Sequence, residues 1–142
     1  MNVTVRGVDA YRRTEAQSAS PMQLVVMLYD GALRFLSEAR AAQTTGDLPR
    51  RAHALRRVTA IVAECHSTLD LERGGAVAAD LDRLYSYIST RLLDVTVHRD
   101  ATALEEVHKL MTTLRQAWAE AAAQDVLDAA AVPPPVAMGM RP

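Results

Sequence analysis

The sequence predicts an all-α protein, an antiparallel up-down-up-down four-helix bundle. The chain has 142 residues, of which only 4% are aromatic, and its apolar residues recur at helical spacing. Four such periodic segments follow one another, separated by connections of only a few residues. Because short connections leave successive helices nearly antiparallel, we expect the four segments to pack as one bundle. The expected bundle covers residues 20–124, between a flexible segment at 1–19 and a flexible, proline-rich tail at 125–142.

The first predicted helix, at 20–43, has a clear start signal. Ser20 suits the N-cap position, and Pro21 suits the first helical position, where no amide donor is needed. Gln23 stands three residues after Ser20, so its side chain can reach back to the Ser20 amide as in a capping box. Gly46 allows the left-handed turn that ends the helix.

The apolar surface of this first helix is wider than a bundle core needs. At about 100° per residue, its apolar residues cover an arc of about 200°, whereas a packing stripe is only a little wider than about 100°. The inner part of the arc contains Leu24, Val25, Leu28, Tyr29, Ala32, Phe35, Leu36 and Ala39. Met22, Val26 and Leu33 form an outer strip, which either contacts a further helix of the bundle or is a binding face.

A second helix is predicted from Asp47, which suits the N-cap position, to residue 69, with Pro49 tolerated in the first turn. Its apolar arc contains Leu48, Ala54, Leu55, Val58, Ile61, Val62, Cys65 and Leu69. Cys65 is therefore expected to be buried and unreactive. As the single cysteine of the chain it excludes an internal disulfide, which suits a reducing compartment.

Gly74 and Gly75 predict a break before the third helix, at 76–99. Its apolar stripe contains Val77, Leu81, Leu84, Tyr85, Ile88, Leu92 and Val95, and three apolar residues fall off that stripe, namely Tyr87, Leu93 and Val97. The fourth helix, predicted at 102–124, has one apolar face and a charged opposite face. That apolar face contains Leu104, Val107, Leu110, Met111, Leu114, Trp118 and Ala121.

Charge and hydropathy argue against nucleic acid and membranes as binding partners. The net charge is −1 with acids and bases interleaved, so the sequence shows no basic face for nucleic acid. No stretch approaches the length of a membrane span, and residues 1–9 contain no apolar signal-peptide core. We therefore expect a cytoplasmic protein without membrane insertion.

Signals for catalysis, cofactors and metals are weak, and we predict no enzyme and none of these sites. Glu105 and His108 have the i, i+3 spacing used in di-metal bundles, but the sequence has no second copy of that pair. A metal-dependent enzyme using Glu64, His66, Glu105 and His108 is the alternative that metal analysis would test.

Three ordered segments closely resemble the flagellar secretion chaperone family FliS. They are SPMQLVVMLYDGAL at 20–33, preceded by Tyr11, then LDLERGGAVA at 69–78 and LDRLYSY at 81–87. The resemblance spans residues 11–122. It implies a cytoplasmic four-helix bundle that binds the disordered C-terminal segment of flagellin, prevents its premature polymerisation and delivers it to the type III export gate.

The resemblance and the apolar arc together predict a set of partner-binding residues. These are Tyr11, Met22, Val26, Tyr29, Leu33 and Tyr87. The alternative is a helical adaptor or dimerisation module, in which Met22, Val26 and Leu33 would form a symmetric homodimer interface. Residues 1–19 have too little apolar surface to fold alone, so we expect Tyr11 to anchor them as a removable cover over the binding groove. A disordered leader, or an arm swapped between two molecules, is the alternative.

Overall fold

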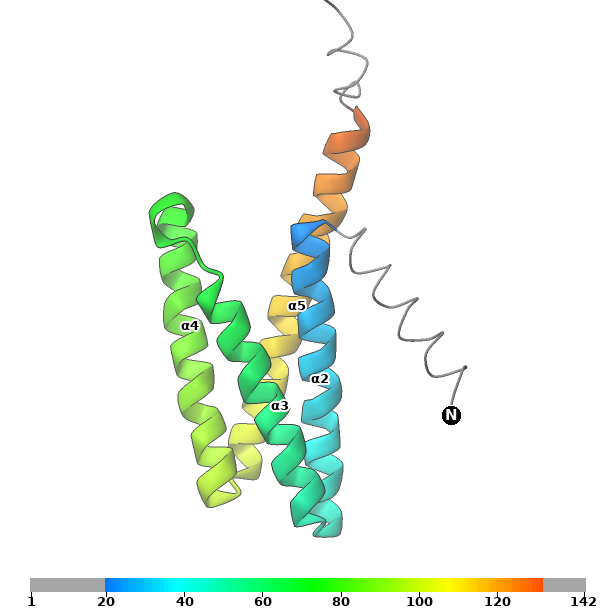
Figure 1. Cartoon of the computed structure of the whole chain (residues 1–142), viewed down its shortest axis with the longest axis vertical. Helices are drawn as coiled ribbons and strands as arrows, with labels where there is room; N and C mark the ends of the chain where they lie inside the picture. The colour runs from blue at the N-terminus through cyan, green and yellow to red at the C-terminus, as the bar shows by residue number, and fades with distance from the viewer. Residues whose placement is uncertain (1–19, 132–142) are drawn as a thin grey trace, which may run out of the picture. The chain divides into compact units, whose positions relative to one another are not determined.

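The computed structural model describes residues 20–131, with side chains through residue 125. Over this range the protein is all-helical, and four helices follow one another (Figure 1). They are α2 (Pro21–Thr45), α3 (Leu48–Ser67), α4 (Leu71–His98) and α5 (Ala101–Ala131). The predicted flexible segment at 1–19 and the proline-rich part of the predicted tail lie outside the described residues.

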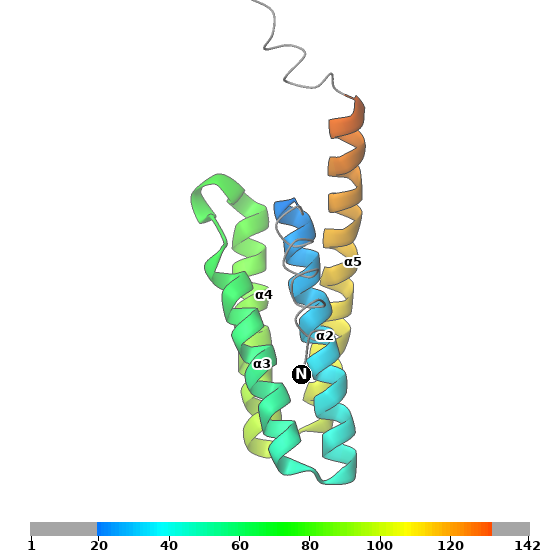
Figure 2. The ribbon, with the colours of Figure 1, turned by 45° about the vertical axis from the view of Figure 1, so that its right-hand side comes forward.

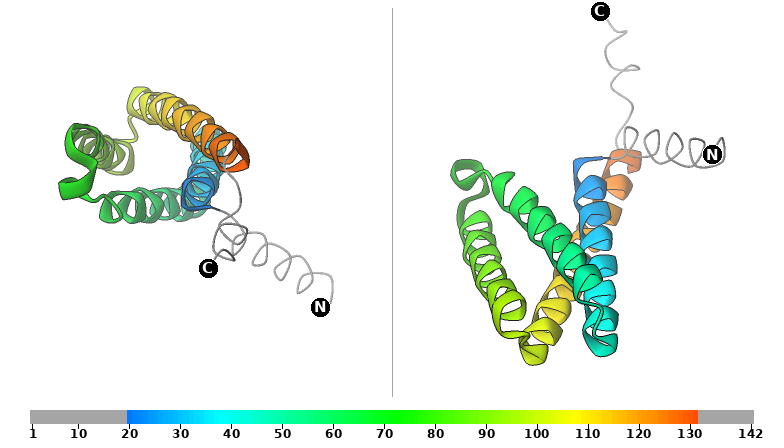
Figure 3. Two further views of the ribbon diagram at one scale, coloured as in Figure 1. Left: turned by 90° about the horizontal axis from the view of Figure 1, so that it is seen from above. Right: turned by 60° about the horizontal axis from the view of Figure 1, so that its bottom comes forward.

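The chain divides into two compact units. The larger unit, Met27–Arg115, contains parts of all four helices, and the smaller one includes residues 20–26 and 116–131. Within the larger unit successive helices run in opposite directions, and α3 packs along α4 (Figure 2). Seen from above, its helices follow a ring in the order α2, α3, α4, α5 (Figure 3). The predicted up-down-up-down four-helix bundle is confirmed.

The predicted starts of α2 and α3 are confirmed by their hydrogen bonds. The Ser20 amide donates to Oε1 of Gln23 at 2.8 Å, and the Gln23 amide donates to Oγ of Ser20 at 3.2 Å. This reciprocal pair is the capping box. At the start of α3, Oδ1 of Asp47 accepts from the Arg50 amide at 3.2 Å. Gly46 has a φ of 77°, so the connection between the two helices turns through the left-handed region as predicted.

The predicted break at the glycine pair is confirmed, because Gly75 has a φ of 56° and a ψ of −133° and kinks α4 there. The long part of α4 therefore follows Gly75, as predicted. The sequence interpretation missed a short helical turn before the kink, which begins at Leu71 and is capped by Asp70 accepting from the Arg73 amide at 3.0 Å. A Cβ atom at Gly75 would meet open space, whereas one at Gly74 would overlap the Cβ atom of Ala78.

Helix α5 begins one residue earlier and ends later than predicted. Oδ1 of Asp100 accepts from the Ala103 amide at 3.0 Å and caps the helix. The predicted end at Gln124 is wrong, since α5 continues to Ala131. The sequence contains no glycine or proline between Gln124 and Pro133, so nothing in the chain stops the helix earlier.

The buried residues of α4 follow a narrow seam with alternating spacings of three and four residues. Ala78, Tyr85, Ile88, Leu92 and Val95 are buried. The other three helices bury Tyr29, Ala32, Leu36, Ala39, Ala42, Ala54, Leu55, Val58, Val62, Cys65, Ala103, Leu104, Val107, Met111 and Ala122. The predicted burial of Cys65 is therefore confirmed.

Three residues of the predicted apolar stripes are exposed rather than buried. Val77 is 69% exposed because the neighbouring residue, Ala78, points into the buried seam of α4 instead. Leu48 is the first residue of α3 and is 46% exposed. Leu24 is 38% exposed and belongs to the smaller unit.

A buried hydrogen bond joins α2 and α4, which are not neighbours in the ring. The hydroxyl oxygens of Tyr29 and Tyr85 are 2.5 Å apart, and the two side chains are 0% and 1% exposed. Leaving a buried hydroxyl unpaired is costly, so the two tyrosines fix each other's place in the core.

Arg51 is a buried arginine on α3, with 6% of its surface exposed. Its Nε donates to Oε1 of Gln43 on α2 at 2.8 Å, and its Nη2 donates to the carbonyl oxygen of Val95 on α4. Burial lowers the pKa of this guanidinium, and the charge of Arg99 lowers it further. One side chain thus connects three helices near the end of the bundle where α4 stops.

Polar side-chain contacts, most of them ion pairs, bridge every neighbouring pair of helices around the ring. They are Glu38–Arg50 between α2 and α3, His66–Asp82 between α3 and α4, Arg91–Glu106 between α4 and α5, and Arg40–Glu105 and Asp30–Arg115 between α2 and α5. Most of these side chains are substantially exposed, so each pair contributes little to stability. Together, however, the pairs link the four helices into one closed ring.

The tyrosine pair makes a testable prediction. Tyr29→Phe and Tyr85→Phe should each lower the free energy of unfolding by about 1 kcal/mol, because each removes the same hydrogen bond. The double variant should then lose less than the sum of the two single losses, measured by urea denaturation. Tyr87→Phe removes the hydroxyl of an exposed tyrosine that bonds to Glu106 and not to Tyr29, so as the control its loss should add to that of Tyr29→Phe. Strictly additive losses from Tyr29 and Tyr85 would show that the two hydroxyls do not interact.

Cys65 should react slowly with thiol reagents in the folded protein. Burial, and next the charge of Glu64, raise the pKa of the Cys65 thiol from 9.0 to about 11. At pH 8 this leaves about 100-fold less thiolate, the reactive form, before any steric protection is counted. Labelling with an aromatic disulfide should therefore be at least about 100-fold slower in buffer than in denaturing urea. Equal rates in both solutions would contradict the burial of Cys65.

Candidate functional site

Four of the predicted partner-binding residues lie on α2, and they differ in exposure. Met22 and Val26 are half-buried in the smaller unit, and Leu33 is half-buried in the larger one. Tyr29 is completely buried, and its hydroxyl lies against that of Tyr85. In this conformation Tyr29 therefore offers no surface to a partner. Tyr11 lies outside the described residues.

Tyr87 on α4 is 44% exposed, and its hydroxyl is part of a polar cluster. It donates to Oε2 of Glu106 on α5 at 2.8 Å, while Nε of Arg91 donates to Oε1 of the same carboxylate at 2.6 Å. Arg91 also donates to Asp94 at 2.9 Å. A partner would therefore meet the ring of Tyr87, because its hydroxyl is already bonded.

The hydrogen bonds of this cluster shift the pKa values of Tyr87, Arg91 and Glu106. The bonds from Tyr87 and then Arg91 lower the pKa of the Glu106 carboxyl. The bond to Glu106 raises the pKa of the Tyr87 phenol and that of the Arg91 guanidinium. Glu106 therefore stays charged and Tyr87 neutral at neutral pH, which keeps the α4–α5 edge hydrogen-bonded.

Large exposed apolar side chains lie on α2 and α4, in addition to Leu48 at the start of α3. On α4, Leu93 and Val97 are 63% and 67% exposed and stand one turn apart on the same face. Their predicted position off the core stripe is confirmed. On α2, Met27 is 37% exposed. Isolated apolar residues on a surface are common, but a pair one turn apart is a contact surface that a partner helix can cover.

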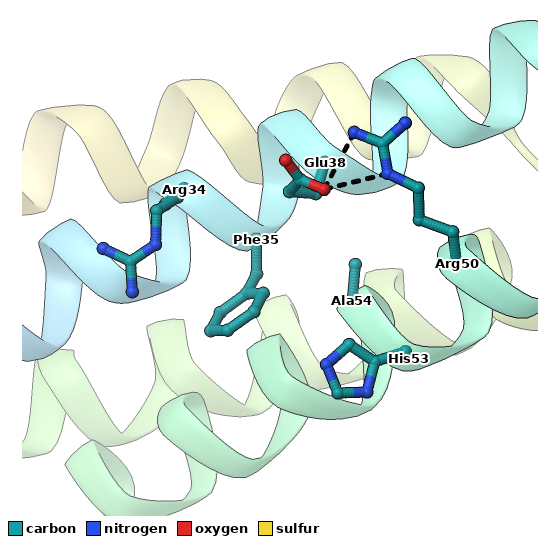
Figure 4. A pocket seen from close by; sticks show the side chains of 6 residues that line it. All are labelled: Arg34, Phe35, Glu38, Arg50, His53 and Ala54. Carbon is teal, nitrogen blue, oxygen red and sulfur yellow. Dashed lines mark hydrogen bonds and ion pairs between the residues drawn. The ribbon is translucent and has the colours of Figure 1, made fainter. Parts of the chain in front are cut away.

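A pocket of about 240 Å³ lies between α2 and α3 (Figure 4). Its walls are formed by Arg34, Phe35, Glu38, Arg50, His53 and Ala54. Oε2 of Glu38 accepts from Nε of Arg50 at 2.9 Å and lies 2.8 Å from its Nη2, so this pair closes one side of the pocket. Phe35 contributes the aromatic wall, and its ring faces the pocket from α2.

The ring of Phe35 is surrounded by nitrogen-containing side chains. The guanidinium carbon of Arg34 lies 5.4 Å from the ring centroid, and that of Arg57 lies 5.6 Å away. The imidazole of His53 meets the ring edge-on, with centroids 6.1 Å apart. The sequence interpretation missed this site because it treats Phe35 as a core residue. His53 and Arg57 belong to α3, so their closeness to Phe35 becomes visible only once α2 and α3 are paired.

The metal-site alternative finds no support among the described residues. His66 is bonded to Asp82 through a 2.6 Å contact, and Glu105 is paired with Arg40 at 2.7 Å. Burial lowers the pKa of His108. In the part of the chain with described side chains, no group of three or more His, Cys, Asp or Glu residues is arranged to hold a metal ion.

Of the helices described, none has the length and apolar character needed to cross a membrane.

Comparison with known proteins identifies the family. The family model described as Flagellar protein FliS matches residues 5–125. The flagellar secretion chaperone FliS of Salmonella typhimurium is 38% identical over 120 residues, which cover 81% of this chain and 89% of that protein. FliS of Campylobacter jejuni is 36% identical over 112 residues, covering 79% and 88%, and FliSB of Pseudomonas aeruginosa is 32% identical over 104 residues, covering 73% and 82%. The match extends over most of the chain, and the chain therefore belongs to the FliS family.

Proposed function

We propose that the protein is a cytoplasmic flagellar secretion chaperone without enzymatic activity. In this proposal it binds the C-terminal segment of flagellin, prevents premature polymerisation and supports type III export by delivering flagellin to an export gate component. The observation that carries the proposal is the family match across residues 5–125, together with relatives whose names describe flagellar secretion chaperones.

The exposed apolar residues of the described helices suit such a client. A disordered segment that folds on binding costs about 2–5 kcal/mol to order, so the chaperone must cover a large apolar area rather than one deep pocket. An amphipathic helix seated in a groove between helices provides such an area. The half-buried Leu33 and the exposed Met27 on α2, with Leu93 and Val97 on α4, supply apolar contacts on two helices that are not neighbours, so the client would cover more than one face of the bundle.

The proposed client contacts are Met22, Val26 and Leu33 on α2, the ring of Tyr87 on α4, and Tyr11 from the N-terminal segment. Tyr29 takes a different part in the proposal. Because it is buried and bonded across the core to Tyr85, it holds α2 in the orientation that leaves Leu33 at the surface. A self-associating adaptor is the competing function, and mass measurement at increasing protein concentration separates it from a chaperone.

Charged substitutions in the outer strip of α2 test the proposed client site. Val26→Asp and Leu33→Asp should each weaken binding of a flagellin C-terminal peptide by about tenfold or more, because they bury a charge in an apolar contact. Isothermal titration calorimetry gives the affinity, and circular dichroism checks the helicity. Ala41→Asp adds the same charge to an exposed position of α2 and is the matched control. Unchanged affinity in both folded variants would rule out this strip as the site.

Removing the N-terminal segment tests whether it covers the binding groove. If residues 1–19 cover the groove through Tyr11, the apparent affinity of the chaperone is reduced by the covered fraction. Deleting residues 1–19 or changing Tyr11 to Ala should then tighten binding of the flagellin peptide and make the empty protein more prone to aggregate. Weaker binding in either variant would instead make Tyr11 a direct client contact.

A further inference from the structure

The pocket between α2 and α3 lies on a different edge of α2 from the proposed client strip. Leu33 and Phe35 are two positions apart on a continuous helix, which separates their side chains by about 200° around the helix axis. A segment lying along the edge that contains Leu33 therefore leaves the Phe35 edge uncovered. The two edges of α2 can consequently contact different partners.

The pocket region has an excess of positive charge. Arg34 and Arg57 stand near the Phe35 ring, Arg50 forms another part of the wall, and Glu38 is the one carboxylate among the residues that line the pocket. Arg50 already occupies that carboxylate through two contacts. Among the described side chains, no acidic group lies within ion-pair distance of Arg34 or Arg57.

The N–H donors of Arg34 and Arg57 are available. The two guanidinium carbons lie 5.4 and 5.6 Å from the Phe35 centroid, and among the described side chains neither guanidinium makes a hydrogen bond or an ion pair. Those N–H groups match a carboxylate, which accepts two parallel hydrogen bonds from one guanidinium. The contact with Phe35 also restricts the motion of each arginine, which reduces the entropy lost when a carboxylate binds.

The charge of the chain argues against an occupant from its own ends. Residues 1–19 contain three arginines and two acids, and residues 132–142 contain one arginine and no acidic side chain, so neither segment complements a basic pocket. Nucleic acid is also disfavoured, because the chain has a net charge of −1 and the pocket is a local cluster rather than an extended basic face. The pocket volume of about 240 Å³ accommodates one or two side chains.

We propose that this α2–α3 pocket binds an acidic segment of a second protein partner, distinct from the flagellin segment. A carboxylate of the segment is held by Arg34 and Arg57, and an apolar side chain next to it enters the pocket beside Phe35 and Ala54. His53 lies at the same wall and offers a ring N–H as a third donor. The chaperone would then bind its client and this second partner at the same time.

Peptide selection against the full-length protein tests the proposal while the partner is unidentified. Random dodecapeptides displayed on phage are selected on the immobilised protein, and the enriched peptides are synthesised and measured by calorimetry. We expect acidic peptides with an apolar residue beside the acid, and a loss of affinity of about tenfold in the Arg34→Ser/Arg57→Ser variant. Arg73→Ser/Arg83→Ser removes the same charge from α4 and is the matched control, which should bind as the unmodified protein does.

Two further measurements keep the result interpretable. Replacing the acidic residue of a selected peptide by its amide should weaken binding as much as the arginine substitutions do. This measurement uses the unmodified protein, so it does not depend on how well the arginine variant folds. Raising salt to ~0.3 M should weaken binding, since the contact is a partly exposed charge pair. Selection of no peptide, selection of peptides without acids, or equal affinity in both arginine variants overturns the proposal. Displacement of the peptide by the flagellin C-terminal segment also overturns it, because the pocket would then be part of the client site.

Flagellin binding itself is measured in parallel with the Arg34→Ser/Arg57→Ser variant. Retained affinity for flagellin, with lost affinity for the acidic peptide, supports two separate sites. If flagellin fails to bind even the unmodified protein, the proposed function fails, but the acidic-peptide result stands on its own. The two proposals therefore have distinguishable outcomes.

Discussion

The buried contact between Tyr29 and Tyr85 is the constraint on which the arrangement of surfaces depends. Most of the buried face of α2 is small, because Ala32, Ala39 and Ala42 contribute little more than a methyl group each. Alanines allow close approach, but by themselves they fix neither the rotation of a helix nor its axial position. Two large side chains that must place their hydroxyls together in an apolar core fix both. With α2 set in this way, Leu33 faces one edge of the helix and Phe35 the other.

Local rules account for the parts of the fold that the sequence predicts correctly. Helix starts depend on a side chain and an amide three residues apart, so Ser20 with Gln23, and Asp47 with Arg50, can be identified without any tertiary information. At α4 the same rules identify the break at the glycine pair, which is present as a kink at Gly75, but the turn that Asp70 caps before it was missed.

The contacts that define the candidate sites could not be predicted, because they join residues far apart in the chain. Tyr29 and Tyr85 are separated by 56 positions, and their pairing follows from the register of α2 against α4. Arg57 approaches Phe35 only because α3 packs against α2. Helical periodicity identifies which side of a helix is apolar, but not which neighbour that side meets. For this reason periodicity places Tyr29 and Phe35 together in the inner part of the apolar arc, although Tyr29 meets Tyr85 in the core and Phe35 forms a wall of the α2–α3 pocket.

The glycine pair in α4 has a consequence for how this segment tolerates mutation. Both positions should resist substitution, but for unrelated reasons: Gly75 has backbone dihedrals that residues with a side chain rarely adopt, whereas Gly74 lacks space beside Ala78. A steric clash can be removed by making the neighbouring side chain smaller. The clash caused by Gly74→Ala should therefore be relieved by a second substitution, Ala78→Gly. No change of neighbour relieves a dihedral conflict. Across diverging sequences, position 74 can therefore exchange its glycine together with position 78, while position 75 must keep its own.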